Sequence, residues 1–248
     1  MSNRKRKANK KTLEPQQERS RESLQKLLRA ATEVLGQHGV EGTTIPRIAQ
    51  HAGLTPGSVY RRFHNKEALL ETAILGMLER TGENVRNLTP EMVREIPLRV
   101  FAEQIINGFV VGYRARAPLL RAIRQFVQGR SRTPFGRKAS RIEIRTYERL
   151  VSLFLTHRDR IKHPDPRIAV STGLMMVVST VFELVVTPTD LSEWKDLLPK
   201  DDQALKRELT RAFLSYLGVE DLGGTAGKME SEQMAAANRW RQRTSQNR

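Results

Sequence analysis

Residues 43–66, with the sequence TTIPRIAQHAGLTPGSVYRRFHNK, constrain the fold of this chain more than any other stretch. Thr44 can cap a first helix, because its hydroxyl accepts a hydrogen bond from an unpaired N–H of the opening turn. Apolar residues then recur at helical spacing up to Gly53, where left-handed backbone commonly ends a helix. Thr55 and Pro56 give the cap and the first position of a second helix. Two short helices joined by a tight turn, the second rich in hydroxyls and arginine, predict a helix-turn-helix that fits the major groove of DNA.

The order and spacing of the residues in this stretch resemble the DNA-binding signature of the TetR (tetracycline repressor-like) family. The residues that carry the resemblance are Thr44, Ile48, Ala49, Ala52, Gly53, Leu54, Thr55, Gly57, Tyr60, Phe63, Lys66 and Leu69. Arg62 departs from the pattern, since the family often has histidine there, but it keeps a basic donor. The resemblance covers roughly residues 20–75 and implies an all-α fold. That fold has an N-terminal three-helix helix-turn-helix DNA-binding domain and a larger helical ligand-binding and dimerisation domain.

The resemblance also implies which side chains meet DNA. The recognition helix is residues 56–63, and the residues expected to face the bases are Thr55, Pro56, Gly57, Ser58, Tyr60 and Arg61. The residues better placed for phosphates are Thr44, Arg47, Arg62 and Lys66. Phosphate contacts set the register and base contacts set the sequence, so the two groups have different roles. A bidentate arginine–guanine pair at Arg61 would supply about 1–3 kcal/mol of discrimination. Taken singly, each of these residues is equally an ordinary solvated side chain; together they predict DNA binding.

Charge points in the same direction. The chain has 248 residues, a formal net charge of +16 and a pI near 10.7, which favour a polyanionic partner, either nucleic acid or an anionic membrane surface. It has no cysteine, so a disulfide, a thiolate metal site and a cysteine nucleophile are all excluded. No apolar stretch follows the basic N-terminus, which predicts a cytoplasmic protein. Residues 168–186 are long enough to span a bilayer, but their serines, threonines and Glu183 favour a buried helix covered by a second subunit.

Composition and periodicity divide the chain into segments. We expect a flexible basic arm over residues 1–20, the helix-turn-helix domain over 21–66, a linking helix over 66–86, an effector-binding and dimerisation domain over 87–220, and a flexible tail over 221–248. The arm is either a solvated tail or a segment that touches DNA phosphates or the minor groove. The first helix is expected from about Arg21 to Gln37. Later helices are expected at 97–118, 119–129, 137–158, 167–187 and 203–217, with a loop at 129–136.

The second domain carries the predicted effector pocket. Aromatic and apolar residues at core spacing are the candidates for its lining, most of them core and one or two facing a cavity: Phe101, Ile105, Phe109, Tyr113, Phe126, Tyr147 and Phe154. Ile144 is expected on the inner face of its helix with Tyr147. Eleven Lys or Arg residues lie between Arg114 and Arg149, four of them at every fourth position from Arg137. These are either a solvated face or, in part, a site for an anionic group of an effector.

The resemblance implies a homodimer formed by the helices at 167–187 and 203–217, packed with their mates as a four-helix bundle. The expected interface residues are Met176, Val177, Thr180, Leu184, Leu209 and Phe213. It further implies a repressor that a small-molecule effector of unknown identity releases from a palindromic double-stranded operator. Two alternatives stay open: a regulator that needs no ligand, and a general nucleic-acid-binding protein driven by its basic arms. No catalytic constellation, metal-ligand spacing or cofactor motif is found, so the protein is expected not to be an enzyme.

Overall fold

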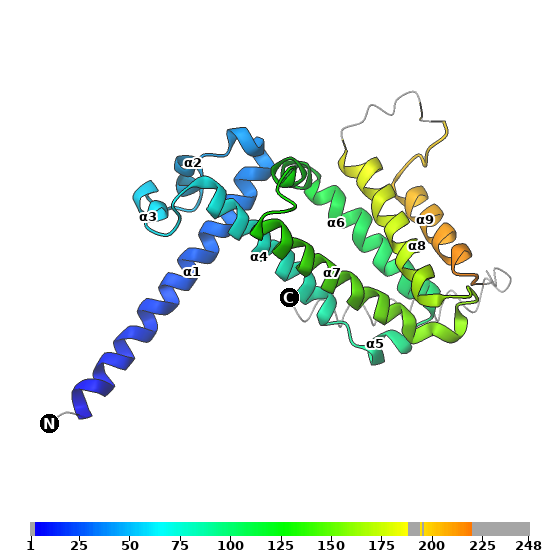
Figure 1. The fold of residues 1–248 in the computed structure, drawn as a ribbon, viewed down its shortest axis with the longest axis horizontal. Helices are drawn as coiled ribbons and strands as arrows, with labels where there is room; N and C mark the ends of the chain where they lie inside the picture. The colour runs from blue at the N-terminus through cyan, green and yellow to red at the C-terminus, as the bar shows by residue number, and fades with distance from the viewer. Residues whose placement is uncertain (1–2, 188–193, 195, 220–248) are drawn as a thin grey trace. The chain divides into compact units, whose positions relative to one another are not determined.

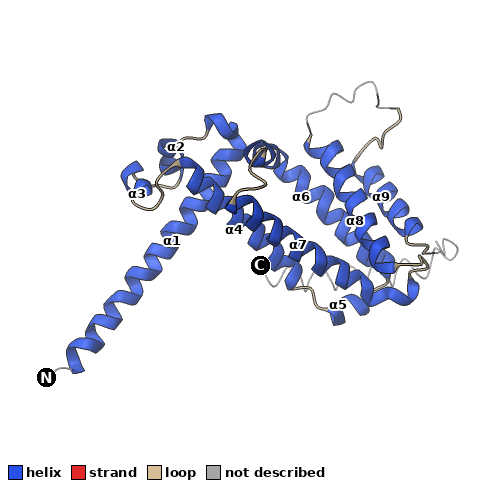
Figure 2. Cartoon of the chain, viewed as in Figure 1, coloured by secondary structure: helices blue, strands red, loops and turns tan. Residues whose placement is uncertain are grey.

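The fold is that of a computed structural model, which describes residues 3–187, 194 and 196–219; side-chain positions are described from residue 17 onward. All regular structure within these residues is helical, which confirms the predicted all-α class (Figure 2). The elements of Figure 1 are α1 (Asn3–Gly42), α2 (Ile45–His51), α3 (Pro56–Tyr60), α4 (Lys66–Arg86), α5 (Pro90–Arg94), α6 (Leu98–Val127), α7 (Pro134–Phe154), α8 (Pro166–Val181) and α9 (Asp202–Tyr216). A 3-10 helix (Leu155–Arg160) follows α7, and a π-helix (Phe182–Val186) follows α8.

The helices form two compact units. The first contains the residues up to Glu79 together with Pro118–Ala139, and the second contains Arg80–Ala117 together with the residues from Ser140 onward. The sequence prediction assigned residues 118–139 to the second domain. They belong to the first unit because Ala122, Phe126 and Phe135 pack into the core of its N-terminal helices.

The core of the first unit gathers one apolar stripe from each of its helices. Its fully buried side chains include Leu27, Ala31 and Leu35 of α1, Ile48 and Ala49 of α2, Val59 of α3, and Leu69, Leu70 and Ile74 of α4. Within each helix these residues are adjacent or four positions apart, so each helix turns one face inward and leaves the other to solvent. The buried faces of the short helices α2 and α3 therefore pack against this core, which fixes the position of their exposed faces.

Helix α1 is longer than the sequence predicted. It begins at Asn3 rather than about Arg21, and it continues past Gln37 to Gly42 through a kink at Gly39, whose φ is +67°. The prediction used the absence of apolar periodicity before residue 21, and that absence indicates lack of packing rather than lack of helix. Lysine, arginine, glutamine and glutamate dominate residues 4–22, and their high helix propensity offsets the cost of Pro15 within the helix. A basic helix therefore takes the place of the irregular arm.

Helix α6 also differs from its prediction. Two helices meeting at Pro118 were expected, but one helix of 30 residues runs through the proline. Pro118 cannot donate to the carbonyl of Arg114, four residues earlier, which normally costs a helix about 3 kcal/mol. Both residues are exposed, so water can bond the carbonyl that the proline leaves unpaired. The proline is tolerated because it lies on the solvent side.

The core of the second unit lies between α6, α7, α8 and α9. Phe154 of α7 is its centre, with its ring centroid 4.6 Å from that of Phe101 and 5.2 Å from that of Phe213. Ile144 is not on the inner face of α7, as predicted, but is 56% exposed, because Ile142 occupies the buried position two residues earlier. Residues two apart point to different sides of a helix, so only one of the pair can face the core.

Helix α8 buries one face and exposes the other. Its inner face carries Ala169, Val170, Gly173, Leu174, Val177 and Val181. Its outer face presents Ile168, Met175 and Met176, which are 46–55% exposed. A single chain therefore leaves one face of this apolar helix uncovered, and its burial against a second subunit stays a prediction. The segment Pro166–Val186 has the length and composition of a membrane-crossing helix, a test that core helices of soluble proteins also pass, and 39% of its most apolar window is buried here.

Candidate nucleic-acid interface

The candidate interface is built on the start of α3. Thr55 has extended backbone and caps the helix: its Oγ1 accepts a hydrogen bond from the Ser58 N–H at 3.2 Å. The hydroxyls of Thr55 and Ser58 lie 2.9 Å apart, and Arg61 Nη2 donates to Ser58 Oγ at 3.1 Å. These contacts hold Thr55, the Ser58 hydroxyl and the Arg61 guanidinium in one row along α3. Because Pro56 fixes the first helical φ, the row is preorganised before any partner binds.

The predicted base-facing residues lie on the exposed side of α3. Thr55, Pro56, Gly57, Tyr60 and Arg61 are exposed and Ser58 is half-buried. The buried side is carried by Val59, which is fully enclosed in the core and fixes the rotation of the helix. Tyr60 is 55% exposed, an unusual state for a large aromatic ring without a partner. No atom lies within 4 Å of the position that a Cβ would take at Gly57, so the backbone there is open to close approach.

The four predicted phosphate-contacting residues surround α3, and the structure gives each a partner. Thr44 caps α2 and accepts from the Arg47 N–H at 3.4 Å, while the Arg47 guanidinium donates to the Gly42 carbonyl. Lys66 is half-buried and its Nζ donates to the Val40 carbonyl at 3.1 Å. Thr44 and Arg47 are both exposed at the start of α2, whereas Thr43 before them is buried.

Arg62 has contacts that local sequence patterns could not reveal. Its Nη1 donates to the carbonyl of Ser20 at 3.3 Å and its Nη2 donates to the Ser20 hydroxyl at 3.2 Å. Ser20 is 42 residues away in sequence, so only the fold brings the two together. The same holds for His51 of α2, whose Nε2 lies 2.7 Å from Glu33 Oε2 of α1. Both contacts tie the helix-turn-helix to α1.

Charge is unevenly shared between the two units. The segments that make up the first unit contain 20 Lys and Arg residues and 8 Glu, a net charge of +12 out of the +16 of the whole chain. Residues 118–139 contribute six of these positive charges and no negative ones. A unit with this excess attracts a polyanion from a distance, and the exposed face of α3 belongs to it.

Comparison with known proteins agrees with this geometry. Residues 27–73, which contain α2, α3 and most of the core beneath them, match the profile of the bacterial regulatory proteins of the tetR family. These residues carry the DNA-binding region of the TetR family. It is 30% identical over 98 residues to the probable HTH-type transcriptional regulator ArpR of Pseudomonas putida, a match that covers 37% of this chain and 47% of ArpR. It is 30% identical over 102 residues to the HTH-type transcriptional regulator TtgR, also of Pseudomonas putida, covering 40% of this chain and 48% of TtgR.

The matched region spans about half the length of these curated relatives. Similarity of fold extends further. A putative TetR-family regulator from Mesorhizobium loti aligns with 81% of this chain and 98% of its own, at a TM-score of 0.61 and 20% identity. The fatty acid degradation regulator FadR of Bacillus halodurans aligns with 79% of this chain and 95% of its own, at a TM-score of 0.56 and 19% identity. The second unit thus shares the helical architecture of TetR-family proteins without close sequence similarity.

The predicted effector-pocket residues do not all lie in one unit, and only some of them keep an exposed surface. Phe101 and Phe154 fill the core of the second unit, and Phe126 lies in the core of the first, under the guanidinium of Arg130 at 4.2 Å. The half-buried residues Ile105, Phe109, Tyr113 and Tyr147 are packed against the core of the second unit. The ring of Tyr113 is 6.0 Å from that of Phe109 and 6.4 Å from that of Phe182. Of the predicted set, these half-buried side chains are the ones with surface left to offer a ligand.

Tyr113 and Tyr147 each carry a phenol hydroxyl whose pKa is raised. The Tyr147 hydroxyl donates to the Ser171 carbonyl at 2.7 Å, and burial raises its pKa to about 12. Burial also raises the pKa of the Tyr113 phenol, and the nearby Glu143 carboxylate raises it further.

Two surface hollows of the second unit lie elsewhere. One, of about 550 Å³, runs between α6 and α9 beside Arg99, Asn107 and Lys206, and the other, of about 450 Å³, lies at the start of α9 beside Arg114. Neither is lined by the predicted pocket residues.

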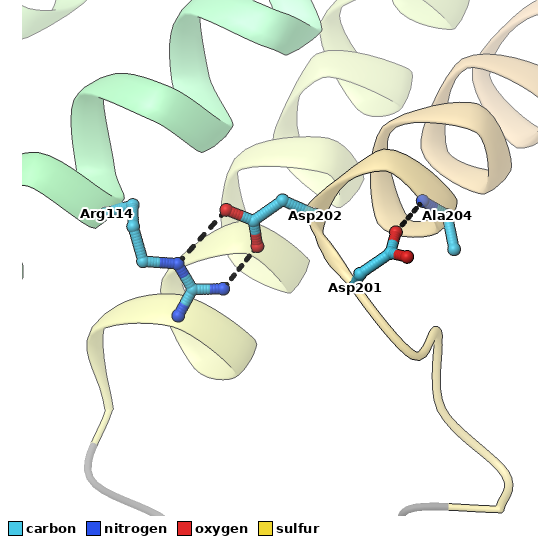
Figure 3. Close-up of polar contacts among 4 residues, drawn as sticks. All are labelled: Arg114, Asp201, Asp202 and Ala204. Carbon is cyan, nitrogen blue, oxygen red and sulfur yellow. Dashed lines mark hydrogen bonds and ion pairs between the residues drawn. The ribbon is translucent and has the colours of Figure 1, made fainter.

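The arginines of the central segment are mostly solvated or paired. Arg137, Arg141 and Arg145 are exposed on α7, as the outer-face interpretation predicted, whereas Arg149 is half-buried and its Nη2 donates to the Leu88 carbonyl at 2.6 Å. Figure 3 shows Arg114 of α6 against Asp202 of α9, with Nε 3.3 Å from Oδ2 and Nη2 donating to Oδ1. The bonds from Arg114 lower the pKa of the Asp202 carboxyl, so the pair stays ionised. Asp201 beside it caps α9 by accepting from the Ala204 N–H at 2.7 Å. The charge of Arg114 is thus already balanced.

The predicted dimer-interface residues fall into two groups. Val177, Leu209 and Phe213 are at most 8% exposed and belong to the core of the second unit, so they are not available to a partner subunit. Thr180 and Leu184 are half-buried, and Met176 is exposed. Periodicity alone identified the helix but could not tell its inner face from its outer one, because α8 is apolar on both.

Proposed function

We propose that this protein is a sequence-specific DNA-binding transcriptional regulator whose α3 reads base edges in the major groove. The observation that carries the proposal is the exposed row of Thr55, Gly57, Tyr60 and Arg61 on a helix fixed from below by Val59, in a unit of net charge +12. Arg61 supplies donors for guanine, and the ring of Tyr60 supplies an apolar contact for a thymine methyl or a hydroxyl for a phosphate. Thr44, Arg47 and Arg62 set the register on the backbone.

The regulator acts as a homodimer on a near-palindromic operator, with one α3 in each half-site. The exposed apolar side chains Ile168, Met175 and Met176 on α8 support this proposal, because exposed apolar residues grouped on one helix face favour burial against a second copy. Within the pair, α8 and α9 would pack with their mates.

A small-molecule effector in the second unit would release the protein from its operator, making it a repressor. The half-buried residues Phe109, Tyr113 and Tyr147 are the side chains best placed to contact such a ligand, since they combine apolar rings with polar tips. The ligand can regulate DNA binding only by binding the two conformations of the protein with different affinity. The curated relatives are transcriptional regulators, and the same function, without catalysis and in the cytoplasm, is proposed for this chain.

Selection of bound duplexes from a random DNA library tests the proposal. The wild type should enrich a palindrome, whereas Tyr60→Ala should lose that enrichment while keeping its thermal stability, because the ring is exposed. Tyr60→Phe is the matched control: it keeps the ring and removes only the hydroxyl, so retained selectivity assigns the contact to the ring.

Equal, sequence-independent binding by the wild type and by Tyr60→Ala would contradict the proposal. It would favour the general nucleic-acid-binding protein, in which positive charge alone supplies the affinity.

A further inference from the structure

Residues 17–22 of α1 do not take part in the core of their unit. The helix begins at Asn3, and the first fully buried side chain along its described part is Leu27. Residues 17–22 are all exposed. Helices shorter than about 12–15 residues are marginal in water, and longer ones usually owe their stability to packing on one face. A helical extension that is exposed over residues 17–22 therefore calls for a partner outside the chain.

The extension is anchored at the recognition helix. Arg62, two residues beyond the end of α3, donates to both the carbonyl and the hydroxyl of Ser20, at 3.3 and 3.2 Å. Ser20 is thus the point where α1 leaves the helix-turn-helix. The two bonds fix the start of the extension next to the residues that would meet DNA.

The extension is strongly positive in sequence. Six Lys and Arg residues lie between positions 4 and 11, four of them consecutive at 4–7. Successive residues of an α-helix are about 100° apart, so four consecutive positions encircle it. Its apolar residues are few, with only Ala8 and Leu13 between positions 3 and 21 apart from Pro15, so it has no apolar face for a membrane surface.

We propose that residues 3–21 form a helical extension that binds the phosphates of DNA flanking the half-site read by α3. The proposal rests on the proposed function, since it takes the DNA complex as given. At about 1.5 Å per residue the extension reaches roughly 26 Å from Ser20, most of one turn of DNA. Because it contacts phosphates only, it adds affinity without adding sequence preference.

The test compares two variants that remove the same charge from different places. The first is Arg4→Gln, Lys5→Gln, Arg6→Gln and Lys7→Gln in the extension. The control is Arg141→Gln, Arg145→Gln, Arg158→Gln and Arg207→Gln, all exposed positions of the second unit. Dissociation constants are measured between about 50 and 200 mM salt, for the selected operator with long flanks, for the same operator trimmed to its palindrome, and for unrelated duplex DNA.

Each lost phosphate contact flattens the plot of log affinity against log salt by about 0.9. If each protomer of a dimer loses one contact, the fold-loss of DNA affinity between about 50 and 200 mM salt should be about ten times smaller for the variant than for the wild type. The extension variant should show this change on long-flanked operator and on unrelated DNA, whereas the control should resemble the wild type. On the operator trimmed to its palindrome, the salt dependence of affinity should be the same for the extension variant and the wild type.

An extension variant whose salt dependence matches that of the wild type would overturn the proposal, provided that the wild type still selects its palindrome. Equal flattening by the two variants would overturn it as well, because net charge rather than position would then be the cause. Loss of palindrome selection by the wild type itself would instead be a failure of the proposed function.

Discussion

Gly173 of α8 lies against the ring of Phe213 of α9. A Cβ at this position would stand 2.7 and 2.8 Å from two ring carbons of Phe213, nearer than carbon atoms approach. Figure 1 shows the two helices side by side in the second unit. We expect Gly173→Ala to lower the free energy of unfolding by about 1–3 kcal/mol, because the buried Phe213 ring has to shift in a packed core. Urea denaturation followed by circular dichroism measures the change.

The matched control for Gly173 is Gly108→Ala in α6. Gly108 is exposed within a helix, and no atom lies within 4 Å of its Cβ position. Alanine there should raise the free energy of unfolding by about 0.5–1 kcal/mol through helix propensity alone. If both substitutions stabilise the protein, the close approach of α8 and α9 at Gly173 does not exist in solution.

Tyr147 should titrate later than an ordinary tyrosine. Burial raises its pKa from 10 to about 12, so the folded state favours the protonated phenol. The stabilisation is fully present below the unfolded pKa of about 10 and is lost as the pH rises through about 12. In an absorbance titration of phenolate, Tyr147→Phe should reduce the transition near pH 12 in the curve of the folded protein. It should also cost about 0.5–1.5 kcal/mol, since the bond to the Ser171 carbonyl is lost.

The four tyrosines of the chain make this assignment testable by subtraction. Burial also raises the pKa of Tyr113, so the expected result in Tyr147→Phe is a smaller late transition, and an unchanged amplitude would show that Tyr147 does not titrate late.

At the scale of the elements, Pro118 limits the stability of α6. The proline stands inside a helix of 30 residues on its exposed side. We expect Pro118→Ala to raise the free energy of unfolding by about 1–3 kcal/mol, because it restores the bond to the Arg114 carbonyl and improves helix propensity. The nearby exposed position Ala115 gives the control, since Ala115→Gly should cost about 1 kcal/mol. A proline variant no more stable than the wild type would show that α6 is broken there.

The elements also show what sequence could and could not predict. The caps Thr44 and Thr55 act as expected, because capping is a local contact within three residues. The fate of Pro118 could not be predicted, since tolerance of a proline depends on which side of the helix meets solvent. Ile144 was misplaced for the same reason: its spacing fits a core position, but Ile142 takes it. The Arg62–Ser20 contact leaves no local signal, because its partners meet only after the chain has folded.

At the scale of the whole molecule, the outer face of α8 explains why the second unit should pair. Met176 is 46% exposed beside Met175 and Ile168 on the same helix. We expect Met176→Arg to give monomers, because a guanidinium cannot be buried against an apolar copy of the same face without a partner charge. Sedimentation velocity measures the mass. Operator affinity should fall together with the dimer, since a palindrome is read by two linked recognition helices.

Two controls separate loss of pairing from loss of folding. Ser140→Arg adds the same charge at an exposed position on α7 and should leave both mass and operator binding unchanged. Val177→Arg, one residue from Met176 but 3% exposed, places the charge in the core and should lower the free energy of unfolding severely. If Met176→Arg stays dimeric while Val177→Arg unfolds, the chain pairs through some other surface, and the apolar outer face of α8 has a different occupant.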